Sequence, residues 1–333
     1  MIRSAIVGCG NIASVHAAVL SASNYAILCA CADVVLDRAE RMSQTYHIPA
    51  YDNLTQMLIN EKPDVLHICT PHYLHVPMAI EALKRGVHVF MEKPAAMDAG
   101  EFSDLVSACQ NNSLYTGVCF QNRYNPQVCY VKAALESGEA GKILGARAFV
   151  TWARGEKYYT ESGWRGQRAL EGGGALMNQS IHTMDLLVHL LGRPKSVSAS
   201  MHNRHLPGII QVEDTVEAFI GFENAQALFY ASTAYAVDAP VMVEIVCEKA
   251  VYTIAGDEVT VKSSGGTDVI NLQPPEALGK SYWGGSHKLC IDDFYQAIAT
   301  GRAFCLTPVD IAPTMALVYG AYQSAATGKP VLV

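Results

Sequence analysis

The chain has 333 residues, half of them hydrophobic, and a formal net charge of −7. This length favours two domains over one, and the apolar fraction is enough for a sizeable core. The acidic balance and the lack of a basic run argue against nucleic acid or a membrane as a partner. No apolar stretch approaches the roughly 20 residues that span a bilayer, and the N-terminus reads as a strand rather than a secretory signal.

The ten cysteines form no Cys-x-x-Cys pair, and Cys29, Cys31, Cys69 and Cys119 fall inside apolar strand patterns. Buried, reduced thiols are therefore expected, as in a cytoplasmic protein. The eleven histidines show no ligand spacing together with the cysteines, so no metal site is expected.

In the first 120 residues, apolar strand runs alternate with amphipathic helical stretches. The strands are expected at 4–7, 27–32, 65–69, 87–91 and 114–119, with helices near 11–21, 36–46, 53–60, 75–85 and 98–111. Asp98 and Glu101 form a capping-box-like pair at the start of the last helix. The alternation predicts an α/β fold with a doubly wound parallel sheet, covered by helices on both faces.

A glycine turn follows the first strand. Gly8 allows a tight turn, and Gly10 lets the backbone approach a pyrophosphate. The helix that opens at Asn11 and Ile12 directs free N–H groups and its positive dipole end at the same place. Ala13 is small enough for close helix–strand packing. The spacing predicts dinucleotide binding, and an ordinary glycine turn in a doubly wound sheet is the alternative.

The carboxylate of Asp33, twenty-three residues after Gly10, is expected at the end of the second strand. There it would accept hydrogen bonds from the adenosine ribose hydroxyls and repel a 2′-phosphate, which favours NAD over NADP. Arg38 is expected on the surface of the next helix rather than at a phosphate.

Glu92-Lys93-Pro94 follows the strand at 87–91, and ligands bind at the carboxyl ends of strands in such sheets. Lys93 is therefore expected beside the cofactor, where an ammonium can stabilise a developing alkoxide. Taken alone, a lysine after a strand is more often a solvated surface residue. Glu92 is positioned to orient Lys93.

The neighbouring strand ends at Thr70-Pro71-His72, so Thr70 and His72 are expected to contact the ribose or the nicotinamide. His75 is either a further cofactor contact or an ordinary histidine at a helix N-terminus.

The pattern changes after residue 122. A helix near 125–137 and a strand at 143–152 lead to a glycine turn at 172–174 and a long helix that ends at Gly192. Strands near 195–202, 213–222, 225–235, 241–247, 250–254, 258–262 and 268–272 have short connections, which indicate an antiparallel sheet. Helices at 286–300 and 308–326 complete the chain, the second with Thr307 as N-cap and Pro308 at its first position.

The long helix carries Asn178, His182, Asp185 and His189 at offsets that share one face. This stripe is either solvated or lines a site. Asn178 and His182 lie one turn apart, so both could reach one substrate, with neutral His182 accepting a hydroxyl proton. Asp185 would hold the imidazole, and His189 would be structural.

Aromatic and basic side chains crowd the segment before the glycines. Aromatic faces suit sugar C–H faces, and arginines suit carboxylate or phosphate, while an oligomer interface rich in aromatics and arginine is an equal alternative. The residues are Trp152, Arg154, Lys157, Tyr158, Tyr159, Trp164, Arg165 and Arg168.

Taken together, these motifs resemble the Gfo/Idh/MocA family over nearly the whole chain. The resemblance rests on Gly8-x-Gly10-x-x-Ala13, Glu92-Lys93-Pro94, Gln121-Asn122-Arg123-Tyr124-Asn125-Pro126, the triple glycine and His182-x-x-Asp185, in that order. It implies a Rossmann domain at 1–122 and an α/β domain at 123–333, whose open, mostly antiparallel sheet supports homodimers or homotetramers.

The resemblance also implies hydride transfer between NAD and a secondary hydroxyl or ketone of a sugar, polyol or sugar derivative. Lys93 and His182 match the family's catalytic lysine and histidine. Gln121 is assigned to the cofactor, and Arg123, Tyr158, Trp164, Arg165, Asn178 and Asp185 to the substrate. Inositol dehydrogenase-like members carry an aspartate at the position of Asn178, so this chain lacks a charge there. A non-catalytic NAD-binding regulator and an NAD-dependent glycosidase remain the alternatives.

Overall fold

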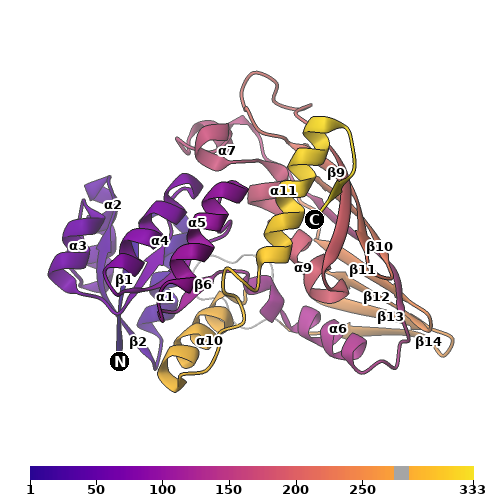
Figure 1. Cartoon of the computed structure of the whole chain (residues 1–333), viewed down its shortest axis with the longest axis horizontal. Helices are drawn as coiled ribbons and strands as arrows, with labels where there is room; N and C mark the ends of the chain where they lie inside the picture. The colour runs from indigo at the N-terminus through magenta and orange to yellow at the C-terminus, as the bar shows by residue number, and fades with distance from the viewer. Residues whose placement is uncertain (274–284) are drawn as a thin grey trace. The chain divides into compact units, whose positions relative to one another are not determined.

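The structure, a computed structural model, describes residues 1–273 and 285–333. These residues form two compact units, drawn in Figure 1. Of the described chain, the first unit contains residues 1–121 and 285–310, and the second contains 122–273 and 311–333. The chain leaves the first unit after residue 121, and residues 285–310, which the sequence analysis placed in the second domain, return to it.

The first unit contains the predicted parallel sheet, with strand order β3-β2-β1-β4-β5-β6. Its strands are β1 (Ile2–Val7), β2 (Ala26–Ala32), β3 (Ala50–Tyr51), β4 (Val65–Ile68), β5 (His88–Met91) and β6 (Thr116–Val118). The two-residue strand β3 was not predicted, because so short a segment carries no periodicity. Strand order reverses between β1 and β4, the crevice where such sheets bind dinucleotides.

The helices of this unit begin and end close to their predicted positions. They are α1 (Asn11–Ser21), α2 (Leu36–Tyr46), α3 (Leu54–Glu61), α4 (His75–Lys84), α5 (Ala99–Gln110) and α10 (His287–Thr300). Short 3₁₀ turns lie at His72–Leu74 and Gln121–Tyr124. Asp98 caps α5 as predicted, since its Oδ1 accepts from the Glu101 backbone N–H at 2.9 Å.

Helix α10 belongs to the first unit because of its aromatic contacts. The ring of Phe294 on α10 lies 5.0 Å from that of Phe90 on β5 and 5.2 Å from that of Phe304. A Cβ on Gly117 in β6 would lie 2.8–2.9 Å from these three rings, so only glycine admits this packing. Contacts between residues so distant in sequence leave no local signal.

The second unit contains a nine-stranded sheet, with order β14-β13-β12-β11-β7-β10-β9-β8-β15. Neighbours pair antiparallel except β7 and β10, which run parallel, so the predicted mostly antiparallel sheet is confirmed. The strands are β7 (Ile143–Thr151), β8 (Pro194–His202), β9 (Thr215–Phe222), β10 (Gln226–Ser232), β11 (Met242–Cys247), β12 (Ala250–Ala255), β13 (Glu258–Ser263), β14 (Gly266–Asn271) and β15 (Val331–Leu332).

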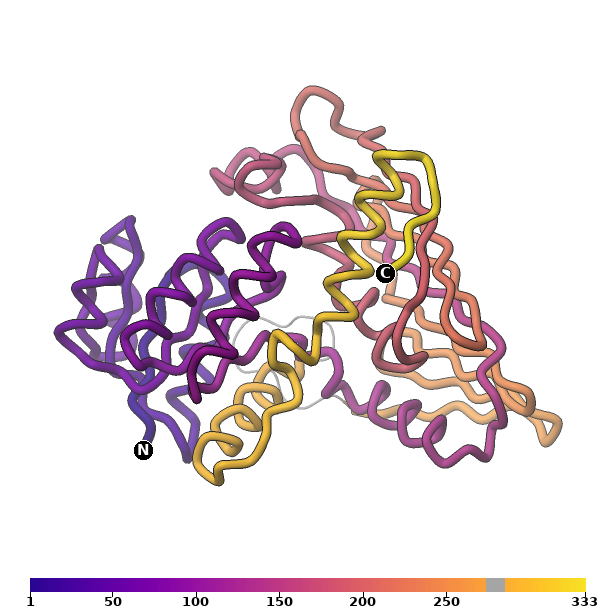
Figure 2. Tube along the Cα trace, in the orientation of Figure 1, coloured from indigo at the N-terminus to yellow at the C-terminus, as the bar shows by residue number. Residues whose placement is uncertain are grey.

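Helices cover one face of this sheet. Helix α11 (Ala312–Thr327), the yellow helix of Figure 2, packs along β8, and α9 (Ile181–Leu191) packs along β7. The remaining helices are α6 (Pro126–Glu136), α7 (Glu156–Thr160) and α8 (Arg168–Glu171), with a π-helical turn at Ala175–Ser180. The predicted long helix after the glycines is thus a π turn followed by α9. None of the helices described is long and apolar enough to span a bilayer.

The predicted start of the last helix was wrong. Thr307 precedes a turn that begins at Pro308, and α11 begins at Ala312 with Pro313 near its N-terminus. The Thr307 hydroxyl instead donates to Asp310 Oδ2 at 2.5 Å, so this cap closes the turn before the helix.

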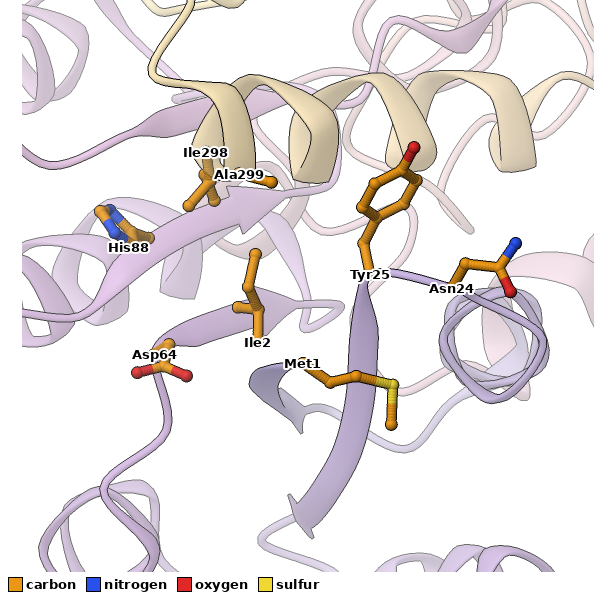
Figure 3. A pocket seen from close by; sticks show the side chains of 8 residues that line it. All are labelled: Met1, Ile2, Asn24, Tyr25, Asp64, His88, Ile298 and Ala299. Atoms are coloured by element: carbon orange, nitrogen blue, oxygen red, sulfur yellow. The ribbon is translucent and has the colours of Figure 1, made fainter.

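A surface pocket of the first unit lies at the opposite edge of the sheet from the predicted cofactor site. Figure 3 shows its lining of Met1, Ile2, Asn24, Tyr25, Asp64, His88, Ile298 and Ala299. Ile2 and His88 begin β1 and β5, and Asp64 directly precedes β4. The pocket is therefore at the amino ends of the strands, where a doubly wound sheet does not bind dinucleotides.

Candidate active site

The glycine turn has the geometry that close approach to a pyrophosphate needs. Gly8 has φ +84°, and a Cβ there would lie 2.7 Å from the Cys69 carbonyl group at the end of β4. Gly10 is the N-cap of α1, and a Cβ on it would meet nothing within 4 Å. Open space in front of Gly10, together with the free N–H groups of α1 at Asn11 and Ile12, fits a bound dinucleotide.

The Asp33 carboxylate is held by backbone groups at the end of β2. Its Oδ2 accepts from the Cys9 N–H and its Oδ1 from the Val35 N–H, both at 2.8 Å. Asp33 is 7% exposed, and its hydrogen bond from the Cys9 N–H ties it directly to the glycine turn. Each oxygen keeps a lone pair that could accept from a ribose hydroxyl. Arg38 is exposed on α2.

Two loops at the carboxyl edge of the sheet are joined by His75. Its Nδ1 lies 2.8 Å from the Pro94 carbonyl and its Nε2 lies 3.0 Å from that of Thr70. Burial lowers the pKa of His75, so its neutral ring carries one N–H and donates to one of the two carbonyl groups at a time. His75 thus links the segment after β4, including buried His72, to the segment after β5. Its direct contact with a cofactor stays a prediction.

Half-buried Lys93 follows a carboxylate that is buried and ionised. Glu92 is 6% exposed, and its Oε1 lies 3.0 Å from His16 Nε2 on α1. Burial alone would raise the pKa of Glu92, but the hydrogen bond and charge of His16 outweigh it and lower that pKa. Burial likewise opposes charging of His16, yet contacts with Cys69 and Glu92 raise its pKa to about 10. The pair is therefore carboxylate and imidazolium.

A buried hydrogen-bond chain continues from His16 across the first unit. His16 Nδ1 lies 2.8 Å from His67 Nδ1, and His67 Nε2 lies 2.8 Å from the Tyr295 hydroxyl. That hydroxyl lies 2.6 Å from Ser4 Oγ. Burial and the charge of His16 lower the pKa of His67, so its neutral ring accepts a hydrogen bond from His16 at Nδ1 and donates one from Nε2 to Tyr295. Each member has a partner, which limits the cost of burying this network.

One group in the described part of the chain brings metal-ligand atoms together. Atoms of His16, Glu92 and Cys119 lie within 4.8 Å of one another, and all three residues are buried. The His16 and Glu92 atoms are already joined by their hydrogen bond.

We expect His16→Gln to weaken the first unit in a pH-dependent way. The contribution of ionised Glu92 to the free energy of unfolding is present above pH 4.5 and is lost as pH falls through the lowered pKa of Glu92. The contribution of protonated His16 to the free energy of unfolding is present below pH 6.5 and is lost as pH rises through its pKa of about 10. Urea unfolding should show a loss of about 3 kcal/mol near pH 5.5 and a smaller loss near pH 9.

Exposed His205 supplies the control, because His205→Gln should change the unfolding free energy by less than about 0.5 kcal/mol at both pH values. An equal loss in His16→Gln at pH 5.5 and pH 9 would contradict the ionised pair.

In the second unit, a buried carboxylate holds the π turn. Glu213 Oε1 accepts from the backbone N–H groups of Gly174 and Leu176, both at 3.0 Å, and from the Tyr322 hydroxyl at 2.7 Å. A Cβ on Gly173 would lie 1.8 Å from the Tyr322 hydroxyl, and one on Gly174 would lie 2.1 Å from the Glu213 carbonyl oxygen. The glycines are required for this approach.

The Asn178 side chain in the π turn is 8% exposed and bound to a second carboxylate. Its Nδ2 donates to Glu171 Oε1 at 2.5 Å, while Glu171 Oε2 accepts from the Gly166 N–H at 2.5 Å. His182 lies four residues after Asn178, in the first turn of α9, and is partly exposed. The turn therefore brings a neutral amide and an imidazole to neighbouring positions.

Of the rest of the predicted stripe, Asp185 is buried and His189 is partly exposed. Asp185 is 1% exposed and accepts from Arg123 Nε at 2.7 Å, Arg123 Nη2 at 2.6 Å and the Thr314 hydroxyl at 2.7 Å. This bidentate pair joins the 3₁₀ turn, α9 and the start of α11. Burial lowers the pKa of His189 to about 4, and the nearby charge of Arg123 adds to this.

Part of the aromatic and basic segment packs beside the π turn. The Tyr158 hydroxyl accepts from Gln179 Nε2 at 2.6 Å, and Arg154 Nε donates to Gln179 Oε1 at 3.1 Å. The Arg165 guanidinium stacks on the rings of Tyr158 and Trp164, at 4.5 and 5.1 Å from their centres. Tyr158, Trp164 and Arg165 therefore gather beside Gln179, the residue that follows Asn178. Lys157 and Arg168 are exposed, and Tyr159 is a core residue.

We expect Gly174→Ala to destabilise the second unit, because the added methyl group would overlap the Glu213 carbonyl. Overpacking of this kind costs about 1–3 kcal/mol. Denaturant unfolding should detect the loss. The matched control is Gly155→Ala, where a Cβ meets nothing within 4 Å and φ is negative. Equal stability of the two variants would contradict the requirement for glycine.

The structure divides the predicted site residues between the units. The first holds the cofactor candidates Gly8, Gly10, Asn11, Ile12, Asp33, Thr70, His72, His75, Glu92, Lys93 and Gln121. The second holds Arg123, Tyr158, Trp164, Arg165, Asn178, His182 and Asp185. Sequence reasoning missed the residues that position them, which are His16, His67, Tyr295, Glu171, Glu213 and Tyr322.

The glycine turn, the strand order and the held Asp33 carboxylate define a dinucleotide-binding protein of the Rossmann class. Residues 2–120 match the family described as "Oxidoreductase family, NAD-binding Rossmann fold", and residues 128–253 match the "GFO/IDH/MocA C-terminal domain". The chain therefore belongs to the Gfo/Idh/MocA oxidoreductase family, as the motifs predicted, and its first unit carries the family's NAD-binding domain.

Named relatives are similar over much of their length. D-glucoside 3-dehydrogenase of Escherichia coli is 27% identical over 255 residues, which is 71% of each chain. The scyllo-inositol 2-dehydrogenase (NAD(+)) of Bacillus subtilis is 24% identical over 343 residues, covering 99% of this chain and 96% of that protein.

Solved structures share the whole fold. The WlbA dehydrogenase from Bordetella pertussis, in complex with NADH and UDP-GlcNAcA, has a TM-score of 0.88 at 27% identity, covering 100% of this chain and 98% of that one. A levoglucosan dehydrogenase in complex with NADH and levoglucosan has a TM-score of 0.91 at 22% identity, with 100% and 99% covered.

Proposed function

We propose that this chain is a dehydrogenase that transfers hydride between NAD and a secondary hydroxyl or ketone of a sugar, polyol or sugar derivative. The observation that carries the proposal is that an NAD-binding domain with Lys93 at its ligand edge is joined to a unit that holds an amide–imidazole pair beside an aromatic and arginine cluster. Relatives named for glucoside and inositol dehydrogenation support this substrate class.

The proposed roles follow from the chemistry of each side chain. Bound NAD supplies a hydride acceptor. Neutral His182 accepts the hydroxyl proton, and Lys93 hydrogen-bonds the same oxygen and stabilises its developing negative charge. Asn178 binds a second hydroxyl, and Tyr158, Trp164 and Arg165 pack against the ring. Arg123 and Asp185, bound to each other, keep the substrate-binding elements in register.

NAD is proposed over NADP because the Asp33 carboxylate would repel a 2′-phosphate. The residues proposed to hold NAD are Gly8, Gly10, Asn11, Ile12, Asp33, Thr70, His72, His75, Glu92, Lys93 and Gln121. Glu92 acts on Lys93 as a buried anion next to it in the chain.

We expect Lys93→Ala and His182→Ala each to reduce turnover by about 10²–10⁴-fold, while NAD binding is retained. NADH absorbance over a panel of inositols, aldoses, uronates and amino sugars, with NAD and NADP, would identify the substrate. Calorimetry would measure NAD binding by the variants. Lys84→Ala and His205→Ala, at exposed positions, are matched controls.

Near-native turnover by both site variants would contradict these roles. NAD binding without reduction on any substrate would favour a regulator, and release of sugar without net NADH would favour glycosidase chemistry.

We also propose that the uncovered face of the second sheet joins copies of this chain into a homodimer or homotetramer. Leu228 and Phe219 are cross-strand partners that are 47% and 49% exposed. Tyr230 and Phe149 are partners beside them, with ring centres 6.3 Å apart. A contiguous apolar face of this kind is typical of an oligomer interface.

Leu228→Glu should therefore shift the protein toward monomers, because it places a charge in the middle of the proposed interface. Light scattering after size exclusion would measure the mass. Exposed Leu332 lies outside this group, so Leu332→Glu is the control. A monomeric wild-type protein would rule the interface out.

A cytoplasmic location is proposed as well. Cys29, Cys31, Cys69 and Cys119 are free and buried. Free, buried thiols are typical of proteins kept in a reducing compartment.

A further inference from the structure

Glu171 has no role in the proposed function, yet it is a nearly inaccessible carboxylate in contact with a proposed substrate residue. It ends the short helix α8, directly before the three glycines, and is 1% exposed. Its Oε2 accepts from the Gly166 N–H, and its Oε1 accepts from Asn178 Nδ2. A buried carboxyl group bound to a site residue is a candidate for controlling the orientation and hydrogen bonding of that residue.

Burial and the neighbouring charges leave the carboxyl group of Glu171 near the midpoint between its protonated and ionised forms at neutral pH. Burial raises the pKa of Glu171 to about 7, while the hydrogen bonds from Asn178 and Gly166 act in the opposite direction. Glu213 also raises this pKa, and Arg165 lowers it. Further titratable groups that interact with Glu171 include the Tyr158 and Tyr159 hydroxyls from α7 and the Tyr322 hydroxyl from α11.

The charge of Glu171 decides how the Asn178 side chain is turned, because one end of an amide donates hydrogen bonds and the other end accepts them. An ionised carboxylate only accepts hydrogen bonds, so Asn178 must turn its NH₂ group toward Glu171 and its Oδ1 away from it. A protonated carboxyl group can donate instead, and the amide can then turn over and present NH₂ on the other side. The two protonation states of Glu171 thus give Asn178 opposite hydrogen-bonding characters.

We propose that Glu171 is a positioning residue that sets which end of the Asn178 amide faces the substrate. Resting on the proposed function, this inference assigns Asn178 as the acceptor for a substrate hydroxyl when Glu171 is ionised. The proton that Glu171 gains or loses is exchanged with solvent. Glu171 makes no contact with the reacting atoms in this scheme and acts through Asn178 alone.

The kinetic test is Glu171→Gln, which keeps the size of the side chain and removes its charge. In the wild type, KM for the sugar should fall as pH rises through about 7. In the variant, KM should be about tenfold higher at pH 8 and independent of pH, while kcat changes by less than about threefold. Glu161→Gln removes a charge at an exposed position of the same segment and is the matched control.

A double-mutant cycle separates positioning from a general loss of structure. If Glu171 acts through Asn178, Glu171→Gln should change KM by less than about twofold in an Asn178→Ala background. An undiminished effect in that background would overturn the proposal. So would a kcat that falls as much as in His182→Ala.

A second measurement needs no substrate. The side-chain amide signals of Asn178, identified by their loss in Asn178→Ala, should shift in nitrogen–proton NMR spectra with a midpoint near pH 7. Glu171→Gln should abolish the shift. A flat profile, or a shift that persists in Glu171→Gln, would overturn the proposal. If the shift is present but no sugar is oxidised with either cofactor, the proposed function fails while the Glu171–Asn178 switch stands.

Discussion

Both groups of site residues depend on backbone segments that approach more closely than any side chain would allow. In the first unit, Gly8 lies against the carbonyl group of Cys69, which brings the glycine turn to the end of β4. In the second, Gly174 lies against the Glu213 carbonyl and Gly173 against Tyr322. A methyl group at any of these positions would move a strand end or a helix start. The placement of Asp33 and of Asn178 follows from these contacts.

Three buried glutamates show how local partners decide the charge of a site. Glu92 is matched by the His16 imidazolium and remains ionised inside the first unit. Glu213 accepts three hydrogen bonds from neutral groups, and burial nevertheless raises its pKa. Glu171 lies between these cases, because Arg165 is near but its hydrogen-bond donors are neutral. Glu92, which stays ionised, is thus next to Lys93 in the chain. Glu171, whose charge changes near pH 7, is bound to Asn178.

Local sequence signals predicted much of this architecture. The period of apolar residues placed α1 and α2 at their observed bounds, and Asp98 with Glu101 marked the start of α5. The π turn at 175–180 was read as regular helix, because its cause is the distant carboxylate of Glu213. Motifs identified Lys93 and His182 as candidates, but His16 and Tyr295 contact their partners across 51 and 228 residues of sequence. Such pairings are set by packing and carry no local pattern.

A neutral residue at position 178 is consistent with a base at position 182. A carboxylate one helical turn from His182 would raise the pKa of the imidazole and favour its imidazolium form. The amide of Asn178 contributes no such charge. Glu171 accepts a hydrogen bond from this amide, and burial keeps its carboxyl group partly protonated at neutral pH. The charge that orients Asn178 is therefore carried by Glu171, and it is present only when that carboxyl group is ionised.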